Sequence, residues 1–209
     1  MTTPRILLAS AMVLVVAMGA RKAIQPPSPA PTTLTIKTHG VQLTQQEAMA
    51  IINQSKTFLP GLSISPGTIS DGGGSGTIAT CKDMDALLAD KSADVHVVKS
   101  IGCCGKSQGQ DIAGCSGLNL PMVVLPLDSH HPENVPLVAV QWMHELGHRK
   151  GLGHDTTTGS LMFKNPGAGN TATTPCELNA FLGLPAAACT SSSIGQQSSH
   201  LPVEPGYHP

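Results

Sequence analysis

One segment of this 209-residue chain, HELGHRKGLGHD from His144 to Asp155, constrains the fold more than any other. It follows an apolar run, and the stretch from Leu137 to Lys150 contains good helix formers and no proline. Because the first half of this stretch is apolar on most sides, it predicts a buried helix. Gly151 predicts the end of that helix, since glycine readily adopts the left-handed conformation that reverses the chain.

The spacing of the histidines in this segment predicts a metal site. His144 and His148 are four residues apart, so on a helix they lie one turn above each other and can share an ion. A bend at Gly151 would bring His154 back to the same ion. Glu145 is rotated by about 100° from His144 and is poorly placed as a ligand, but it can reach a water at the ion. Three neutral imidazoles leave one coordination position open, as in catalytic rather than structural zinc sites.

The same residues resemble a known family. HELGHRKGLGH resembles the H-E-x-x-H-x-x-G-x-x-H signature of the metzincin zinc endopeptidases. Met162, eight residues after His154, resembles the methionine turn beneath the metal, with the spacing found in matrixins. Asp155 instead resembles the adamalysins, so the resemblance assigns no subfamily. Lys150 departs from the family pattern, which is usually apolar there; a cation would favour the C-terminus of the helix.

The resemblance implies a fold and an activity. It implies an α+β, metzincin-like zincin fold, with a twisted mixed β-sheet, a zinc-binding active-site helix and a small C-terminal subdomain. One catalytic Zn²⁺ on His144, His148 and His154 would activate water for hydrolysis of a protein or peptide substrate. Glu145 would accept the proton and deliver it to the leaving amine. Met162 would form an apolar floor under the imidazoles. No pattern in the chain supports a calcium site.

The substrate of such an enzyme lies extended beside an edge strand of the sheet. We place this strand at Gly117 to Val124, with Pro121 and Pro126 excluding a central strand and favouring an edge strand or an irregular one. The predicted substrate-binding residues are Gly117, Leu118, Asn119 and Leu120.

Two other functions fit the same motif. One is a catalytically silent, zinc-stabilised binding or adhesion module, and the other is hydrolysis of a small amide. An intact Glu145 favours an enzyme over the binding module, because a decayed enzyme usually loses its general base.

The N-terminus has the pattern of an export signal. An uncharged apolar run of 15 residues, Ile6 to Ala20, follows Arg5 and ends in small residues. A membrane anchor is the alternative, but spanning a bilayer takes about 20 residues. We therefore predict a signal peptide at 1–20, a Pro-rich spacer at 21–36, a metzincin-like catalytic domain at 37–190 and a flexible tail at 191–209. The mature protein would be secreted or periplasmic, without stable membrane association.

Six cysteines lie beyond the predicted signal, and an even number in an exported chain favours disulfides. Cys176 and Cys189 are expected to pair near the C-terminus. The other four, Cys81, Cys103, Cys104 and Cys115, are expected to pair among themselves, without a bond between the two adjacent cysteines. No C-x-x-C pair supports a cysteine zinc site.

Charge and local patterns complete the prediction. With a net charge of −1 and 12% charged residues, the chain has no basic surface for nucleic acid, and we expect a monomer. Capping-box patterns predict helices at about 45–57, after Thr44, and at about 175–183, after Thr174. Residues 83–90 predict a short helix, and residues 63–80 a strand, a loop and a second strand. His96 lies in a predicted strand and is interpreted as structural.

Overall fold

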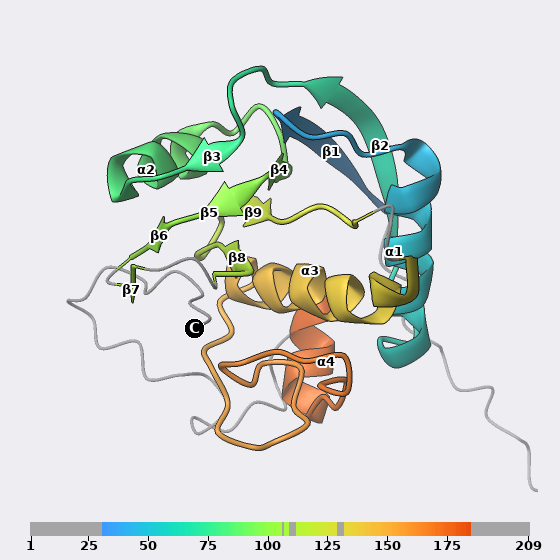
Figure 1. Cartoon of the computed structure of the whole chain (residues 1–209). Helices are drawn as coiled ribbons and strands as arrows, with labels where there is room; N and C mark the ends of the chain where they lie inside the picture. The colour runs from blue at the N-terminus through green and yellow to red at the C-terminus, as the bar shows by residue number, and fades with distance from the viewer. Residues whose placement is uncertain (1–30, 106, 109–111, 129–131, 185–209) are drawn as a thin grey trace, which may run out of the picture.

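The computed structural model describes residues 31–105, 107–108, 112–128 and 132–184, and a five-stranded sheet forms its centre (Figure 1). The strand order is β2-β1-β4-β9-β8, and all neighbouring strands are parallel except β8 and β9, which are antiparallel. The predicted mixed sheet is therefore confirmed, and most of it is parallel. Its strands are β1 (Thr32–His39), β2 (Ile64–Asp71), β4 (Val95–Val98), β8 (Gly114–Cys115) and β9 (Met122–Val124).

Two smaller pairings flank this sheet. Strand β3 (Thr77–Ile78) pairs in parallel with β5 (Ser100–Ile101), and β6 (Cys103–Cys104) pairs antiparallel with β7 (Ser107–Gln108). The helices are α1 (Gln45–Phe58), α2 (Cys81–Ala89), α3 (Val135–Arg149) and α4 (Pro175–Leu182), with a 3-10 turn η1 (Pro132–Asn134) before α3. No helix in the described part of the chain is long and apolar enough to span a membrane.

Local signals fix where the helices begin. The capping boxes predicted at Thr44 and Thr174 are both present, with each threonine side chain accepting a hydrogen bond from the backbone of the glutamate three residues later. Helix α2 begins in the same way at Thr80, where Asp83 takes the glutamate's place. These bonds satisfy backbone N–H groups that have no partner within the first turn of a helix.

Alternating side chains divide the core between the two faces of the sheet. Val95 and Val97 of β4, with Met122 and Val124 of β9, pack on the face that α1 and α3 cover. Val123 belongs to a second apolar cluster, which includes residues of α2. Figure 1 shows α4 on the side of α3 that faces away from the sheet. Helix α3 is thus enclosed, which explains why its residues from Val138 to His148 are almost all buried.

His96 is fully buried in β4, as its structural interpretation requires. Its Nε2 lies 3.0 Å from the carbonyl oxygen of Asp90, and its Nδ1 lies 3.0 Å from Nε2 of His39. Burial lowers the pKa of His96, although the bond to the Asp90 carbonyl acts in the opposite direction. The ring is therefore held neutral between two strands, which is the state that a core histidine can maintain.

An ion pair fastens the end of α3 to the sheet. Arg149 Nη2 lies 2.6 Å from Asp94 Oδ1, and Arg149 Nη1 donates to the Asp94 carbonyl oxygen over 3.3 Å. Burial acts to raise the pKa of Asp94, but hydrogen bonds from the Thr35 backbone and from Arg149 outweigh it and lower that pKa. The carboxylate therefore stabilises the fold in its ionised form.

The structure corrects two sequence predictions. The stretch Gly117 to Val124 is not an edge strand: only Met122–Val124 is a strand, and it lies between β4 and β8. Pro121 and Pro126 lie outside those three residues, so they remove no hydrogen bond from the ladder. The edge strand on this side is β8.

The second correction concerns the Pro-rich spacer, predicted to reach residue 36. Strand β1 begins at Thr32, because Leu34 and Ile36 alternate with threonines and place both apolar side chains in the core. The predicted signal peptide and the C-terminal tail lie outside the described residues.

The four central cysteines pair among themselves, as predicted. Cys81 bonds Cys103, and Cys104 bonds Cys115, so two adjacent residues are tied in different directions. Cys176 is disulfide-bonded as well. Its predicted partner, Cys189, lies outside the described residues.

Candidate metal centre

Helix α3 and the turn after it bring the three predicted histidines together. His144 and His148 lie on α3, which ends at Arg149 with Lys150 as its C-cap, and Gly151 follows with a φ of 87°. In this left-handed conformation the N–H of Gly151 donates to the His148 carbonyl oxygen over 2.9 Å. The chain thereby turns back, and one ring nitrogen from each histidine, including His154, lies within 4.8 Å of the others.

Backbone carbonyl groups orient two of the rings. His144 Nδ1 lies 2.8 Å from the Leu161 oxygen, and His148 Nδ1 lies 2.9 Å from the Leu152 oxygen. Since a carbonyl oxygen can only accept, each Nδ1 carries a hydrogen and donates it. The Nε2 atom of each neutral ring then presents its lone pair, and this arrangement is characteristic of histidines that bind a metal.

The donor set fits a zinc ion. The Nε2 atoms of His144 and His148 are only 2.9 Å apart, close enough for both to bind one ion. Imidazole nitrogen is a preferred ligand of Zn²⁺, and three such ligands leave a position for water or substrate. His144 and His148 are buried while His154 is exposed, so the cluster opens to solvent on the His154 side.

Glu145 is completely buried and lies against the edge strand of the sheet. A Cβ atom added to Gly114 of β8 would stand 2.5 Å from both Cγ and Oε1 of Glu145. Only a glycine therefore leaves room for the glutamate side chain under β8. The sequence prediction missed Gly114, because nothing in the sequence distinguishes it from the other glycines of that loop.

Met162 is fully buried beneath α3, and its role in a methionine turn stays a prediction. A Cβ atom added to Gly147 of α3 would meet its Sδ, and would stand 2.9 Å from its Cε. Two backbone bonds fix the turn: Ser160 Oγ accepts from the Met162 N–H over 3.1 Å, and the Met162 oxygen accepts from the Asp155 N–H over 2.7 Å. The segment after His154 is thereby attached to the methionine turn.

The predicted substrate-binding residues form a turn at the end of α3. The N–H of Asn119 donates to the Arg149 oxygen over 3.0 Å, and Asn119 has a φ of 59°. The exposed side chain of Leu118 lies beside Gly151. Gly117 is buried and Leu120 is half-buried, and the bond from Asn119 attaches this turn to the C-terminal end of α3. Their contact with a substrate stays a prediction.

Comparison with known proteins adds two solved structures. No protein-family model matches the chain, and no curated protein sequence matches it. Metalloproteinase-II from Bacteroides fragilis is similar with a TM-score of 0.45 and 15% identity, over 76% of this chain and 55% of that chain. The archaemetzincin of Methanopyrus kandleri is similar with a TM-score of 0.42 and 14% identity, over 78% of this chain and 91% of that chain. The chain thus spans about half the length of the Bacteroides protein, and the functional argument depends on the three-histidine cluster itself.

Proposed function

We propose that this chain is an exported zinc endopeptidase with its active site at the end of α3. The observation that carries the proposal is the set of three imidazoles, two of which are turned by backbone carbonyls so that their Nε2 lone pairs converge. His144, His148 and His154 would hold the ion. A zinc ion bound there supplies Lewis acidity, which makes water a stronger acid and polarises a carbonyl group.

The residues around the cluster support hydrolysis in particular. Glu145 follows the first proposed ligand on the same helix and lies beneath β8. In the proposed mechanism it would accept a proton from water and return it to a leaving amine. Its burial excludes bulk water, so a charge on its carboxylate acts strongly on groups nearby.

The edge of the sheet supports a peptide as substrate. Within the described residues β8 pairs only with β9, so its other edge has no strand partner, although Gly114 and Cys115 are both buried. A peptide that paired with Gly114 and Cys115 would run past Glu145, because Gly114 lies directly against that side chain. Main-chain pairing of this kind recognises the backbone of a substrate rather than its side chains.

The experiment compares the purified chain with Glu145→Gln, using casein cleavage and metal content as readouts. Wild type should carry one zinc per chain and lose cleavage on chelation, with recovery when zinc is restored. Glu145→Gln should keep the zinc and lose about 10²–10⁴-fold in rate, which is the usual contribution of a general base. Asp85→Asn, an exposed change on α2, is the control and should match wild type.

Three results would contradict the proposal. Full activity of Glu145→Gln would remove the glutamate from the mechanism. Zinc binding without cleavage of any protein or peptide would instead favour the binding module. N-terminal sequencing of the mature protein tests the export part separately, since an intact Met1 would contradict signal cleavage.

A further inference from the structure

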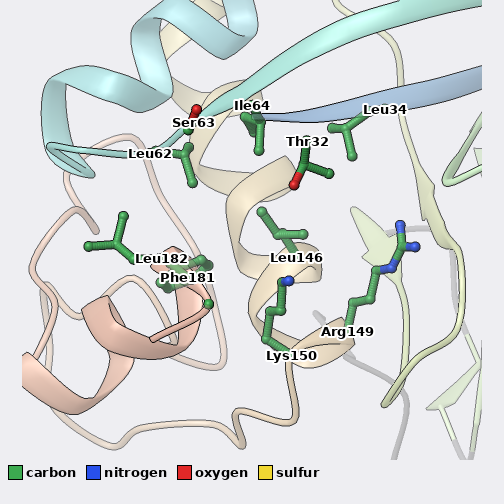
Figure 2. Close-up of a pocket in the computed structure, with 11 residues that line it drawn as sticks. Thr32, Leu34, Leu62, Ser63, Ile64, Leu146, Arg149, Lys150, Phe181 and Leu182 are labelled. Carbon is green, nitrogen blue, oxygen red and sulfur yellow. The ribbon is translucent and has the colours of Figure 1, made fainter. Parts of the chain in front are cut away.

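A pocket lies along α3 and is lined by residues other than the three histidines (Figure 2). It has a volume of about 170 Å³ and opens between the start of β1, the loop before β2, and α4. Its walls are mainly aliphatic and aromatic side chains: Leu34, Leu62, Ile64, Leu146, Phe181 and Leu182. Such a surface favours an apolar group over water.

Two cations border this pocket, and only one of them is neutralised by the protein. The guanidinium group of Arg149 binds Asp94, so its charge is already compensated. Lys150 is exposed, forms no ion pair with any residue in the described ranges, and turns its side chain toward the pocket beside Leu146 (Figure 2). The pocket therefore combines an apolar interior with one positive charge at its mouth.

Thr32 adds a hydrogen-bond donor to the same rim. It lines the pocket at the start of β1, and Figure 2 shows its hydroxyl oxygen turned inward, toward Leu146. An ammonium group and a hydroxyl group can both donate to one carboxylate. The positive charge of Lys150 disfavours a cationic ligand, and the apolar walls disfavour a ligand that is polar throughout.

We propose that this pocket binds an aliphatic monocarboxylate whose tail has about six carbons. The tail would lie among the leucines and Phe181, and the carboxylate would accept hydrogen bonds from Lys150 and Thr32. The volume sets the length, because an engineered apolar cavity of about 150 Å³ binds benzene, a molecule of six carbons. Lys150 stands where the resembling family usually has an apolar residue, and binding of a carboxylate would explain this difference.

This site is separate from the metal centre. Leu146 and Lys150 follow His144 by two and six residues, which turns them by about 200° and 240° around the helix axis. The ligand would therefore contact the back of α3 and none of the three histidines. The proposal is independent of the peptidase activity, and its test needs no catalytic readout.

The test is a titration of the full chain with butanoate, hexanoate, octanoate and hexan-1-ol, followed by calorimetry or by NMR shifts. Affinity should rise about fourfold for each added methylene until the pocket is full, and then level off. Hexanoate should bind at least about tenfold more tightly than hexan-1-ol, because a hydrogen bond to a charged partner contributes about 1.5–3 kcal/mol.

Two variants separate the charge from the apolar walls. Lys150→Met keeps a long apolar side chain, so it should leave hexan-1-ol unaffected and reduce hexanoate to the affinity of the alcohol. Leu182→Ala should weaken both ligands by the same factor. Lys91→Met, another exposed lysine that lies outside the pocket lining, is the matched control and should bind like wild type.

Clear results would overturn the proposal. The proposal is wrong if hexanoate shows no saturable binding to the wild-type chain. This holds also if hexanoate fails to bind because another part of the chain fills the pocket. Equal affinities for hexanoate and hexan-1-ol, or an unchanged hexanoate affinity in Lys150→Met, would remove the carboxylate from the proposal. Both variants alter exposed or half-buried side chains, and circular dichroism checks that they fold.

Discussion

A substitution at Gly147 tests how tightly Met162 packs against α3. It lies in the interior of α3, where helix propensity alone favours alanine over glycine by about 1 kcal/mol. The structure predicts the opposite sign. An added Cβ atom would collide with Met162 Sδ and would stand 2.9 Å from Met162 Cε and 3.2 Å from Phe181 Cζ. Real Cβ atoms essentially never have contacts under 3.0 Å, so Met162 must move.

The size of the destabilisation caused by Gly147→Ala depends on how far the Met162 side chain can move. Its side chain is fully buried, and its backbone N–H and carbonyl oxygen bond Ser160 and Asp155. Overpacking of a well-filled core costs about 1–3 kcal/mol. After subtraction of the propensity gain, Gly147→Ala should lower the free energy of unfolding by up to about 2 kcal/mol.

A double-mutant cycle separates the two contributions. In a Met162→Ala background the contact with sulfur is gone, so Gly147→Ala should now stabilise the protein by about 1 kcal/mol. The coupling energy between the two positions should therefore be about 1–3 kcal/mol. Urea denaturation of the four proteins, all in the presence of a chelator, measures it without a contribution from bound metal.

The reasoning has a definite failure. If Gly147→Ala stabilises both backgrounds equally, the coupling energy is close to zero. The glycine would then carry no packing role, and the placement of Met162 against α3 would be wrong.

Two further predictions concern stability. Gly76→Ala should lower the free energy of unfolding by more than about 2 kcal/mol, because φ is 72° and the new Cβ would overlap the His39 carbonyl group. Gly73 has the same φ but open space around it, so Gly73→Ala should lose only the backbone strain of about 1–2 kcal/mol. Equal losses of stability for the two variants in thermal denaturation would refute the overlap. The lowered pKa of Asp94 adds stability above the ordinary aspartate pKa of about 3.9, and this stability is lost as the pH falls through the folded value. The difference in unfolding free energy between wild type and Arg149→Met should therefore shrink on acidification below pH 4, and a constant difference would contradict the ion pair.

The helices and the cluster could be predicted because their signals are local. Capping boxes at Thr44 and Thr174 fix the first turns of α1 and α4 through bonds between residues three apart. His144, His148 and His154 lie within eleven residues, so helix geometry and one glycine turn are enough to bring them together.

The order of the strands could not be predicted, because it depends on contacts between distant residues. Strand β8 has only two residues and follows a cysteine-rich loop, so no alternation of apolar and polar residues marks it. Its position at the edge displaces β9 to the interior. The fit of Gly114 over Glu145 is hidden for the same reason, since the two lie 31 positions apart in the chain.

The bonds of Cys103 and Cys104 have a consequence for how the molecule opens. One ties the start of α2 to β6, and the other ties β6 to β8, closing loops with sequence separations of 22 and 11. Each such crosslink contributes about 3 kcal/mol in the chain-entropy description, a large fraction of the stability of an ordinary domain. Strands of two residues have few ladder bonds to replace that contribution. Reduction of both disulfides should therefore let α2, β6 and β8 unfold together as one local unit, while the parallel strands and α3 stay folded. The disulfides, rather than strand pairing, would then hold the edge of the sheet beside Glu145.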